Sequence, residues 1–150
     1  MELKRVVVTG VGAITPLGHN VADTWAAIVA GKSGAAPITR FNTEKFKTHF
    51  ACEVKDFDPK QYIDRKEANK MDLYTQFAMV SAMEAVKDSG MDLETIDKTR
   101  IGVVYGVGIG GINTFETEVS NYAKHEEDGP KYSPFFIPKM IADIASGMIS

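Results

Sequence analysis

The stretch RIGVVYGVGIGGINTFE, residues 100–116, joins a short apolar run to a glycine-rich turn and the start of a polar, helix-like segment. Its glycines Gly106, Gly108 and Gly111 have the spacing G-x-G-x-x-G. In dinucleotide-binding proteins, loops of this spacing wrap a pyrophosphate at the start of a helix. Glycines also follow a strand where another backbone or a long ligand must approach closely. The stretch therefore predicts a strand, a tight turn and a helix, and leaves a nucleotide site and close packing as alternatives.

The nucleotide alternative requires a second strand that ends in Asp or Glu about 20 residues after the glycines, where the acid binds the ribose. The corresponding segment is EEDGPKYSPFF, and no strand-like run leads into it. A second glycine loop, TGVGAITPLG at residues 9–18, resembles the TGxxxGxG motif of short-chain dehydrogenases, but Ile14 and Pro16 replace two of its glycines. Both contexts favour tight turns over phosphate binding. A nicotinamide-dependent oxidoreductase stays as an alternative class.

Apolar periodicity and end signals predict strands that alternate with helices along the chain. Asn20 and Gly31 are residue types that start and end a helix, and Asp58 followed by Pro59 starts another. The predicted strands are residues 5–9 and 100–105 with an edge strand near 50–54, and the predicted helices are 21–30, 72–89, 112–123 and the segment 138–150. This alternation predicts an α/β fold with a largely parallel sheet.

The longest predicted helix carries apolar side chains at helical spacing. Leu73, Phe77, Val80 and Met83 recur at helical spacing on one face. Met79, Ala82 and Val86 widen that face. So broad an apolar face predicts a helix that is covered on more than one side.

The composition fits a soluble protein of one domain. The chain has 150 residues, a net charge of −3 and a hydrophobic fraction of 44%. A general nucleic-acid binder would need a basic surface, so that class is disfavoured. No apolar run reaches the length of roughly 18 residues that crosses a membrane, and the N-terminus lacks a secretory signal. The single cysteine, Cys52, predicts a reducing compartment, the cytoplasm.

Five ordered segments together resemble the N-terminal part of a β-ketoacyl-acyl carrier protein synthase, in particular the elongating synthase II of dissociated bacterial fatty-acid synthesis. The segments are RVVVTGVGAITPLG, SGAAPITRF, RKEANKMD, YGVGIGG and SPFFIPKMIADIASG, at residues 5–18, 33–41, 65–72, 105–111 and 133–147. The resemblance covers essentially the whole chain. It implies the thiolase-like α/β fold, of which residues 1–150 would be an incomplete first half, and a homodimeric assembly.

The resemblance also implies a reaction. Members of the family join an acyl group held on a cysteine to malonyl-acyl carrier protein, which loses carbon dioxide. Two histidines, supported by a lysine, assist this decarboxylation. Thiolates both attack and leave thioesters readily. No metal or nucleotide cofactor is implied. The family's nucleophile motif would follow residue 150, so we expect this N-terminal domain to carry no catalytic residue and to be inactive alone. A non-catalytic ketosynthase-like subunit is the other alternative.

The resemblance assigns an acyl pocket to Gly108, Ile109, Phe135 and Phe136. Ile109 would gate the acyl tunnel between its flanking glycines, and the two phenylalanines would form an apolar wall near a dimer interface. Ordinary core packing is the alternative for all three apolar side chains.

The resemblance also places the docking of the acidic carrier protein near Arg65, Lys66 and Lys70. Lys66 and Lys70 are one helical turn apart and could share a face. Cations at such a surface would steer association more than they tighten binding. A solvated charged surface is the alternative.

Cys52 is a candidate nucleophile only because it is the single cysteine. Its setting, HFACEVKDF, is strand-like and lacks a glycine-lined turn, so the sequence predicts a buried, inert thiol. In a regular strand, His49 would point to the opposite face. His19, His49 and His125 lie far apart in the sequence without metal-ligand spacing, and no metal site is expected.

Overall fold

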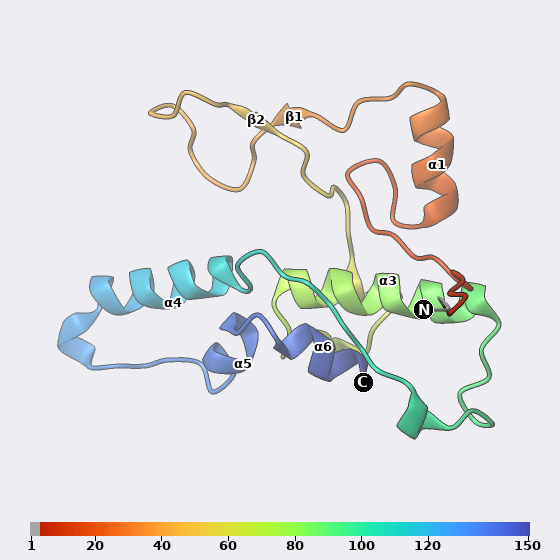
Figure 1. Cartoon of the computed structure of the whole chain (residues 1–150). Coiled ribbons are helices and arrows are strands. Elements are labelled where there is room, and N and C mark those ends of the chain that lie inside the picture. Colours follow the sequence, from red (N-terminus) through yellow and green to blue (C-terminus); the bar gives the residue numbers. More distant parts are fainter. Residues whose placement is uncertain (1–3) are drawn as a thin grey trace. The chain divides into compact units, whose positions relative to one another are not determined.

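The computed structural model describes residues 4–150, which divide into two compact units. The first unit contains the chain up to Phe57 together with Ser81–Asp92, and the second contains Asp58–Val80 and Leu93–Ser150. The longest helix, α3 (Leu73–Ser89), gives its first half to the second unit and its second half to the first (Figure 1). No helix of the described chain is long and apolar enough to cross a membrane.

Helix α1 (Val21–Val29) in the first unit has the ends that the sequence predicts. The side chain of Asn20 accepts a hydrogen bond of 2.7 Å from the backbone N–H of Asp23, which satisfies one of the free donors of the first turn. Gly31 follows the helix with a φ of 65°, a conformation that glycine adopts without strain. The predicted helix is therefore confirmed.

A short antiparallel hairpin completes the first unit. Strand β1 (Ala36–Pro37) pairs with β2 (Phe50–Ala51), so the predicted edge strand near residues 50–54 forms over two residues only. Beyond the ladder, Glu53 accepts hydrogen bonds from the Thr39 hydroxyl, at 2.7 Å, and from its backbone N–H. The hydroxyl contact holds the pKa of the Glu53 carboxyl below its ordinary value.

In the second unit, short capped helices precede α3. These are η1 (Pro59–Gln61), capped by Asp58 as predicted, and α2 (Arg65–Ala68), capped by Asp64. Along α3 the buried side chains are Thr75, Ala78 and Val80, whereas Leu73 and Phe77 are half-buried. In the first unit the second half of the same helix is more open, and Met83 is exposed. Burial on α3 is therefore narrower than the apolar pattern predicts.

Helix α4 (Ile112–Lys124) packs against α5 (Phe136–Met140) in the second unit, and α6 (Ile144–Ile149) follows α5 along the chain (Figure 1). Aromatic rings make this contact: Phe136 stacks on Phe115 at 6.3 Å and on Tyr132 at 5.3 Å between ring centroids. The remaining helical turns are η2 (Lys98–Arg100) and η3 (Glu126–Asp128). The helices predicted at residues 112–123 and 138–150 are thus present, the second divided between α5 and α6.

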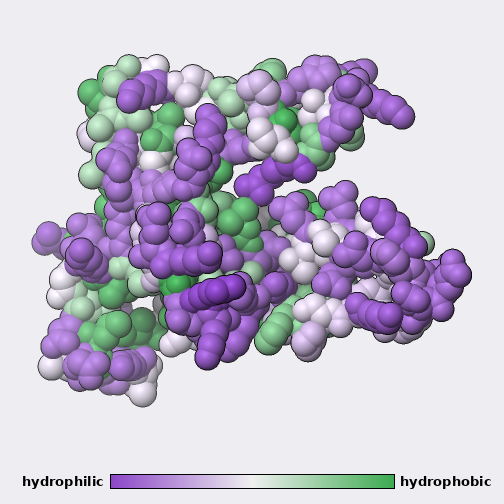
Figure 2. Space-filling view, turned by 180° about the vertical axis from the view of Figure 1, so that it is seen from behind, coloured by the Kyte–Doolittle hydropathy of each residue, from purple (hydrophilic) through white to green (hydrophobic). Residues whose placement is uncertain are grey.

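The strands predicted for residues 5–9 and 100–105 are wrong for the described chain. Neither segment pairs with a strand, and the β1–β2 hairpin is the sheet found among residues 4–150. Val6 and Val104 are 89% and 99% exposed, and apolar residues are visible at the surface in Figure 2. A β-branched run forms a buried strand only where neighbouring strands bond its backbone and other elements cover it. These residues find neither partner here.

The two glycine loops pack closely on other backbone. In the first unit, a Cβ on Gly12 would lie 1.9 Å from the backbone oxygen of Ser81 in α3. In the second unit, a Cβ on Gly111 would lie 2.0 Å from the backbone oxygen of Lys139, and the Gly111 N–H donates to Met140 O at 3.1 Å. Close packing, one of the two alternatives for residues 100–116, therefore explains Gly111.

Gly111→Ala should lower the free energy of unfolding by more than about 2 kcal/mol, because the methyl group overlaps the Lys139 carbonyl and the loop must move away. Gly108→Ala is the matched control, since a Cβ at position 108 would meet no atom within 4 Å beyond its chain neighbours. We expect it to change stability by less than about 0.5 kcal/mol. Urea unfolding of the two variants measures the difference, and equal losses would contradict the close contact at Gly111.

Candidate functional site

The loop before α4 presents an apolar side chain beside a hollow of about 240 Å³. Ile109 is 72% exposed and lines this hollow with Gly111, Ile112, Phe115 and Met140. Gly108 on one side of Ile109 has open space around its α-carbon, and Gly110 on the other has a φ of 96°. The arrangement gives Ile109 an apolar surface to lie against and places it between two glycines, of which Gly108 has open space around it and Gly110 packs close to the backbone oxygen of Met140.

The two predicted wall residues separate. Phe136 stacks on Phe115, which lines the Ile109 hollow, so Phe136 supports that hollow from behind. Phe135 instead lines a second hollow of about 310 Å³, whose other lining residues are Glu67, Lys70, Met71, Thr75, Pro138, Ile144 and Met148. Two of the predicted pocket residues, Ile109 and Phe136, are therefore brought together around Phe115, and Phe135 belongs to a neighbouring apolar surface.

The second hollow is held by a contact from α3 to the segment after α5. The hydroxyl of Tyr74 donates a hydrogen bond of 2.5 Å to the backbone oxygen of Ile141. Burial raises the pKa of this hydroxyl above its ordinary value. The contact fixes the α5–α6 segment beside the first half of α3.

The predicted docking residues lie at the surface of α2 and just after it. Arg65 and Lys66 are exposed, and neither makes an ion pair among the described residues. Lys70 differs, because its ammonium group lies 2.6 Å from a Glu67 carboxylate oxygen. Lys70 is also at the edge of the hollow lined by Phe135. Arg65 and Lys66 therefore offer more uncompensated positive charge than Lys70 does.

The prediction of a buried thiol at Cys52 is wrong, because the structure leaves Cys52 exposed. Strand β2 ends at Ala51, and this short hairpin provides no cover for the next residue. The three described histidines are engaged elsewhere: His49 contacts the Thr43 hydroxyl at 3.3 Å, His19 the Lys55 backbone oxygen at 2.7 Å, and His125 the Asn121 backbone oxygen at 2.9 Å. In the part of the chain that the structure describes, no group of three or more acidic, histidine or cysteine side chains could hold a metal ion.

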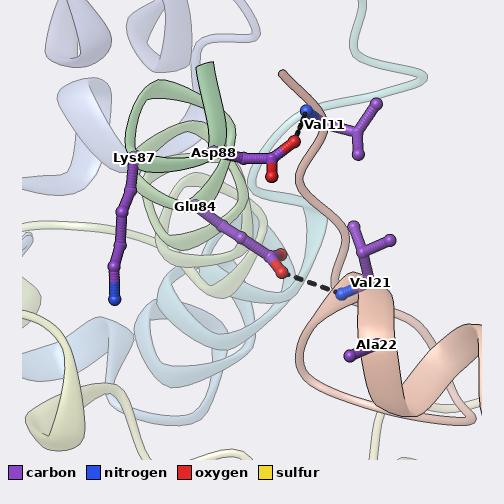
Figure 3. Close-up of a pocket in the computed structure, with 6 residues that line it drawn as sticks. All are labelled: Val11, Val21, Ala22, Glu84, Lys87 and Asp88. Carbon is purple, nitrogen blue, oxygen red and sulfur yellow. Dashed lines mark hydrogen bonds between the residues drawn. The ribbon is translucent and has the colours of Figure 1, made fainter. Parts of the chain in front are cut away.

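The loop of residues 10–21 binds carboxylates of its own chain. Glu84 accepts hydrogen bonds of 2.9 Å from the backbone N–H groups of Ala13 and Val21, one on each carboxylate oxygen. Asp88 accepts one of 2.9 Å from Val11, and Figure 3 shows this bond and the one from Val21. A bound phosphate would need such N–H groups. The carboxylates already occupy them, which argues against a nucleotide at this loop.

The loop at residues 106–111 also faces a carboxylate. Asp72 is buried at the start of α3, where it accepts hydrogen bonds from the Thr114 hydroxyl and the Tyr74 N–H. One of its oxygens is 3.1 Å from the position of a Cβ on Gly111, the N-cap of α4. The positive end of the α4 dipole stabilises a carboxylate at this position. The negative charge of that carboxylate would repel a pyrophosphate. Neither glycine loop therefore has the electrostatics of a nucleotide site.

Three carboxylates bind the glycine loops or the helix that follows them: Glu84, Asp88 and Asp72. The sequence did not identify any of the three. Their partners are far away along the chain. Asp88 and Val11 are 77 residues apart, Glu84 is 71 residues from Ala13 and 63 from Val21, and Asp72 is 42 residues from Thr114. The i, i+4 spacing of Glu84 and Asp88 places both on one face of a helix, but an exposed acidic face gives the same pattern. Only the fold identifies their partners.

Comparison with known proteins accounts for the whole chain. The family model for the β-ketoacyl synthase N-terminal domain matches residues 3–150. A 3-oxoacyl-[acyl-carrier-protein] synthase 2 of Coxiella burnetii is 49% identical over 100% of this chain, and one of Staphylococcus aureus is 45% identical over 98% of it. The chain spans about a third of the length of these curated relatives, 36% and 35% respectively.

Solved structures give the same relationship. The ishigamide ketosynthase/chain length factor matches 95% of this chain and 35% of its own, with 30% identity and a TM-score of 0.76. A type II PKS acyl-carrier protein in complex with its ketosynthase matches 99% of this chain and 38% of its own, with 28% identity and a TM-score of 0.77. The predicted class, a partial α/β thiolase-like fold, is confirmed by this likeness. The chain belongs to the β-ketoacyl synthase family and corresponds to its N-terminal domain.

Proposed function

We propose that the full-length protein carrying this chain is a 3-oxoacyl-acyl carrier protein synthase of fatty-acid elongation. It would transfer an acyl group to a cysteine and condense it with malonyl-acyl carrier protein, releasing carbon dioxide and forming the 3-oxoacyl thioester. The observation that carries the proposal is the 43–49% identity, over nearly the whole chain, to relatives named 3-oxoacyl-[acyl-carrier-protein] synthase 2.

The chemistry itself is assigned to residues beyond position 150. Cys52 is exposed, and the His49 ring contacts the Thr43 hydroxyl at 3.3 Å, so our proposal does not place the base that generates the thiolate in this hairpin. We therefore assign residues 1–150 to substrate binding and not to bond making. The single N-terminal domain would end before the nucleophile motif, and alone it would be inactive.

An acyl chain needs a dry apolar surface, since each buried CH₂ contributes about 0.8 kcal/mol. The hollow beside Ile109 has that character: an aliphatic gate residue, the Phe115 ring backed by Phe136, and Met140. We assign Gly108 and Ile109 to a mobile gate, Phe136 to the support of its wall, and Phe135 to the neighbouring apolar hollow. These assignments rest on apolar lining and on the two flanking glycines.

The exposed cations favour an acidic partner. Arg65 and Lys66 are uncompensated at the surface, and one of the similar structures is described as a ketosynthase in complex with an acyl-carrier protein. We propose carrier-protein docking at Arg65, Lys66 and Lys70. A homodimer is proposed from the exposed aromatic rings of Tyr132 and Phe135, and a cytoplasmic location from the single cysteine.

A non-catalytic ketosynthase-like subunit is the second candidate, because one similar structure is described as a ketosynthase/chain length factor. Purified full-length protein, given an acyl primer and malonyl-acyl carrier protein, distinguishes the two. If the protein catalyses condensation, mass spectrometry should detect the 3-oxoacyl product, and carbon dioxide should be released. Absence of both, with intact folding and carrier-protein binding, would favour the non-catalytic subunit.

Cys52→Ala should leave condensation within about twofold of the unchanged protein, because the exposed thiol is not the proposed nucleophile. Iodoacetamide should alkylate Cys52 in the folded protein, since the side chain is open to solvent. Peptide mapping after incubation with an acyl-carrier protein donor should find no acyl group on Cys52. A stoichiometric acyl adduct there, lost in Cys52→Ala, would show that the nucleophile has been misplaced.

Ile109→Phe should lower the elongation of long acyl primers by about tenfold or more relative to short ones, because the larger ring occupies space that the acyl chain needs. The readout is kcat/KM for a series of primer lengths. Ile28→Phe is the matched control, since Ile28 is a half-exposed isoleucine of α1 that does not line either hollow. Equal losses for short and long primers would instead mean a general folding defect.

The double variant Arg65→Glu/Lys66→Glu should slow association with an acidic carrier protein by about tenfold at low salt, and added salt should reduce the difference. Lys98→Glu/Arg100→Glu is the matched control, because it makes the same charge change in another short, aspartate-capped helical turn, η2. Stopped-flow binding measures both. Equal slowing by the two double variants would indicate a net-charge effect and remove the docking assignment.

A further inference from the structure

The segment of residues 10–21, here called the strap, is held on α3 by two carboxylates. The strap N–H groups that these carboxylates bind belong to Val11, Ala13 and Val21, and Figure 3 shows the acceptors Glu84 and Asp88 reaching toward the strap from one face of the helix. Charge-assisted hydrogen bonds of this kind are about twice as strong as neutral ones. The strap therefore depends on two side chains of a distant helix.

Packing under the strap makes the contact close. A Cβ on Gly10 would lie 2.2 Å from the Ala85 backbone oxygen, and one on Gly12 would lie 1.9 Å from that of Ser81. The strap backbone thus rests directly on α3, where only glycine fits. At this distance the carboxylates one turn further along can reach the strap without stretching.

Glu84 also joins two positions of the strap that lie on either side of its turn. One of its oxygens binds Ala13 and the other binds Val21, while Thr15 and Gly18 close the turn between them through a hydrogen bond of 2.9 Å from Thr15 N–H to Gly18 O. Val21 is the first residue of α1, so the same carboxylate satisfies a free donor at the start of that helix. Loss of Glu84 would release both ends of the turn and the helix start together.

We propose that Glu84 and Asp88 form a carboxylate clamp that makes the strap open and close on α3 as one cooperative unit. The carboxylates occupy the backbone donors that a phosphate would bind in a nucleotide loop, and the chain thereby supplies its own anion. The hollow of about 530 Å³ at this place, lined by Val11, Val21, Ala22, Glu84, Lys87 and Asp88, would change whenever the clamp opens. This conformational device is independent of the proposed enzymatic function.

Amide hydrogen exchange of the full-length protein, resolved to single residues, tests the clamp. Glu84→Ala keeps α3 helical, because alanine is the best helix former, and removes both acceptors. We expect exchange to accelerate about tenfold or more at Ala13 and Val21 and also at Val11, which Asp88 still binds. Asp88→Ala should accelerate the same three amides. Glu116→Ala, an exposed glutamate of α4, is the matched control and should change none of them.

The decisive comparison is between direct and indirect partners. If each variant accelerates only the amides that its own carboxylate binds, the strap is a set of independent hydrogen bonds and the clamp is overturned. Glu84→Gln serves where Glu84→Ala fails to fold, since one amide oxygen replaces two acceptors and should give a smaller acceleration of the same three amides. Formate should slow exchange in Glu84→Ala by returning an anion to the vacated donors, and should leave Glu116→Ala unchanged.

Discussion

Carboxylates on α3 and just before it are the interaction on which the rest of the structure depends, because they accept hydrogen bonds from the loop of residues 10–21 and from the first turn of α4. In the first unit Glu84 and Asp88 bind the strap, and in the second unit Asp72 binds Thr114 at the start of α4. Each bond needs its loop backbone close to a helix, which explains why glycine stands at positions 12 and 111. A buried or partly buried carboxylate that accepts several hydrogen bonds remains stable, whereas one left unpaired would be costly.

The same interaction separates this chain from nucleotide-binding proteins with similar loops. Phosphate loops leave their N–H groups free and their helix N-termini positive, ready for an anionic ligand. Here an internal anion is present at both places, so the glycine loops serve the packing of the fold. The loop before α4 then becomes a mounting for Ile109, and its chemistry is apolar. Glycine spacing alone does not distinguish these uses, because both require backbone without side chains.

Local signals predicted much of the fold. Asn20 and Gly31 mark the ends of α1, Asp58 and Pro59 mark η1, and the helices from residues 73 and 112 follow their predicted starts. Strands at residues 5–9 and 100–105 were not found, because pairing partners are a long-range property that a short β-branched run does not contain. The prediction that Cys52 is buried failed for a similar reason, since burial depends on cover from other elements. Of the site, Ile109 and Phe136 converge through Phe115, whereas Glu84, Asp88 and Asp72 have no sequence signal beyond being acidic residues on a helix.

Cys52 has a practical consequence for pharmacology. If the proposed reaction uses a cysteine, an electrophile aimed at that residue also meets any other accessible sulfur. The thiol beside β2 is open to solvent. Part of any electrophilic compound would therefore react with Cys52, which takes no part in the proposed reaction. The mass increase of the intact protein would then count molecules labelled at Cys52 and overstate inhibition. Peptide mapping, which separates Cys52 from the proposed nucleophile, gives the fraction modified at each cysteine.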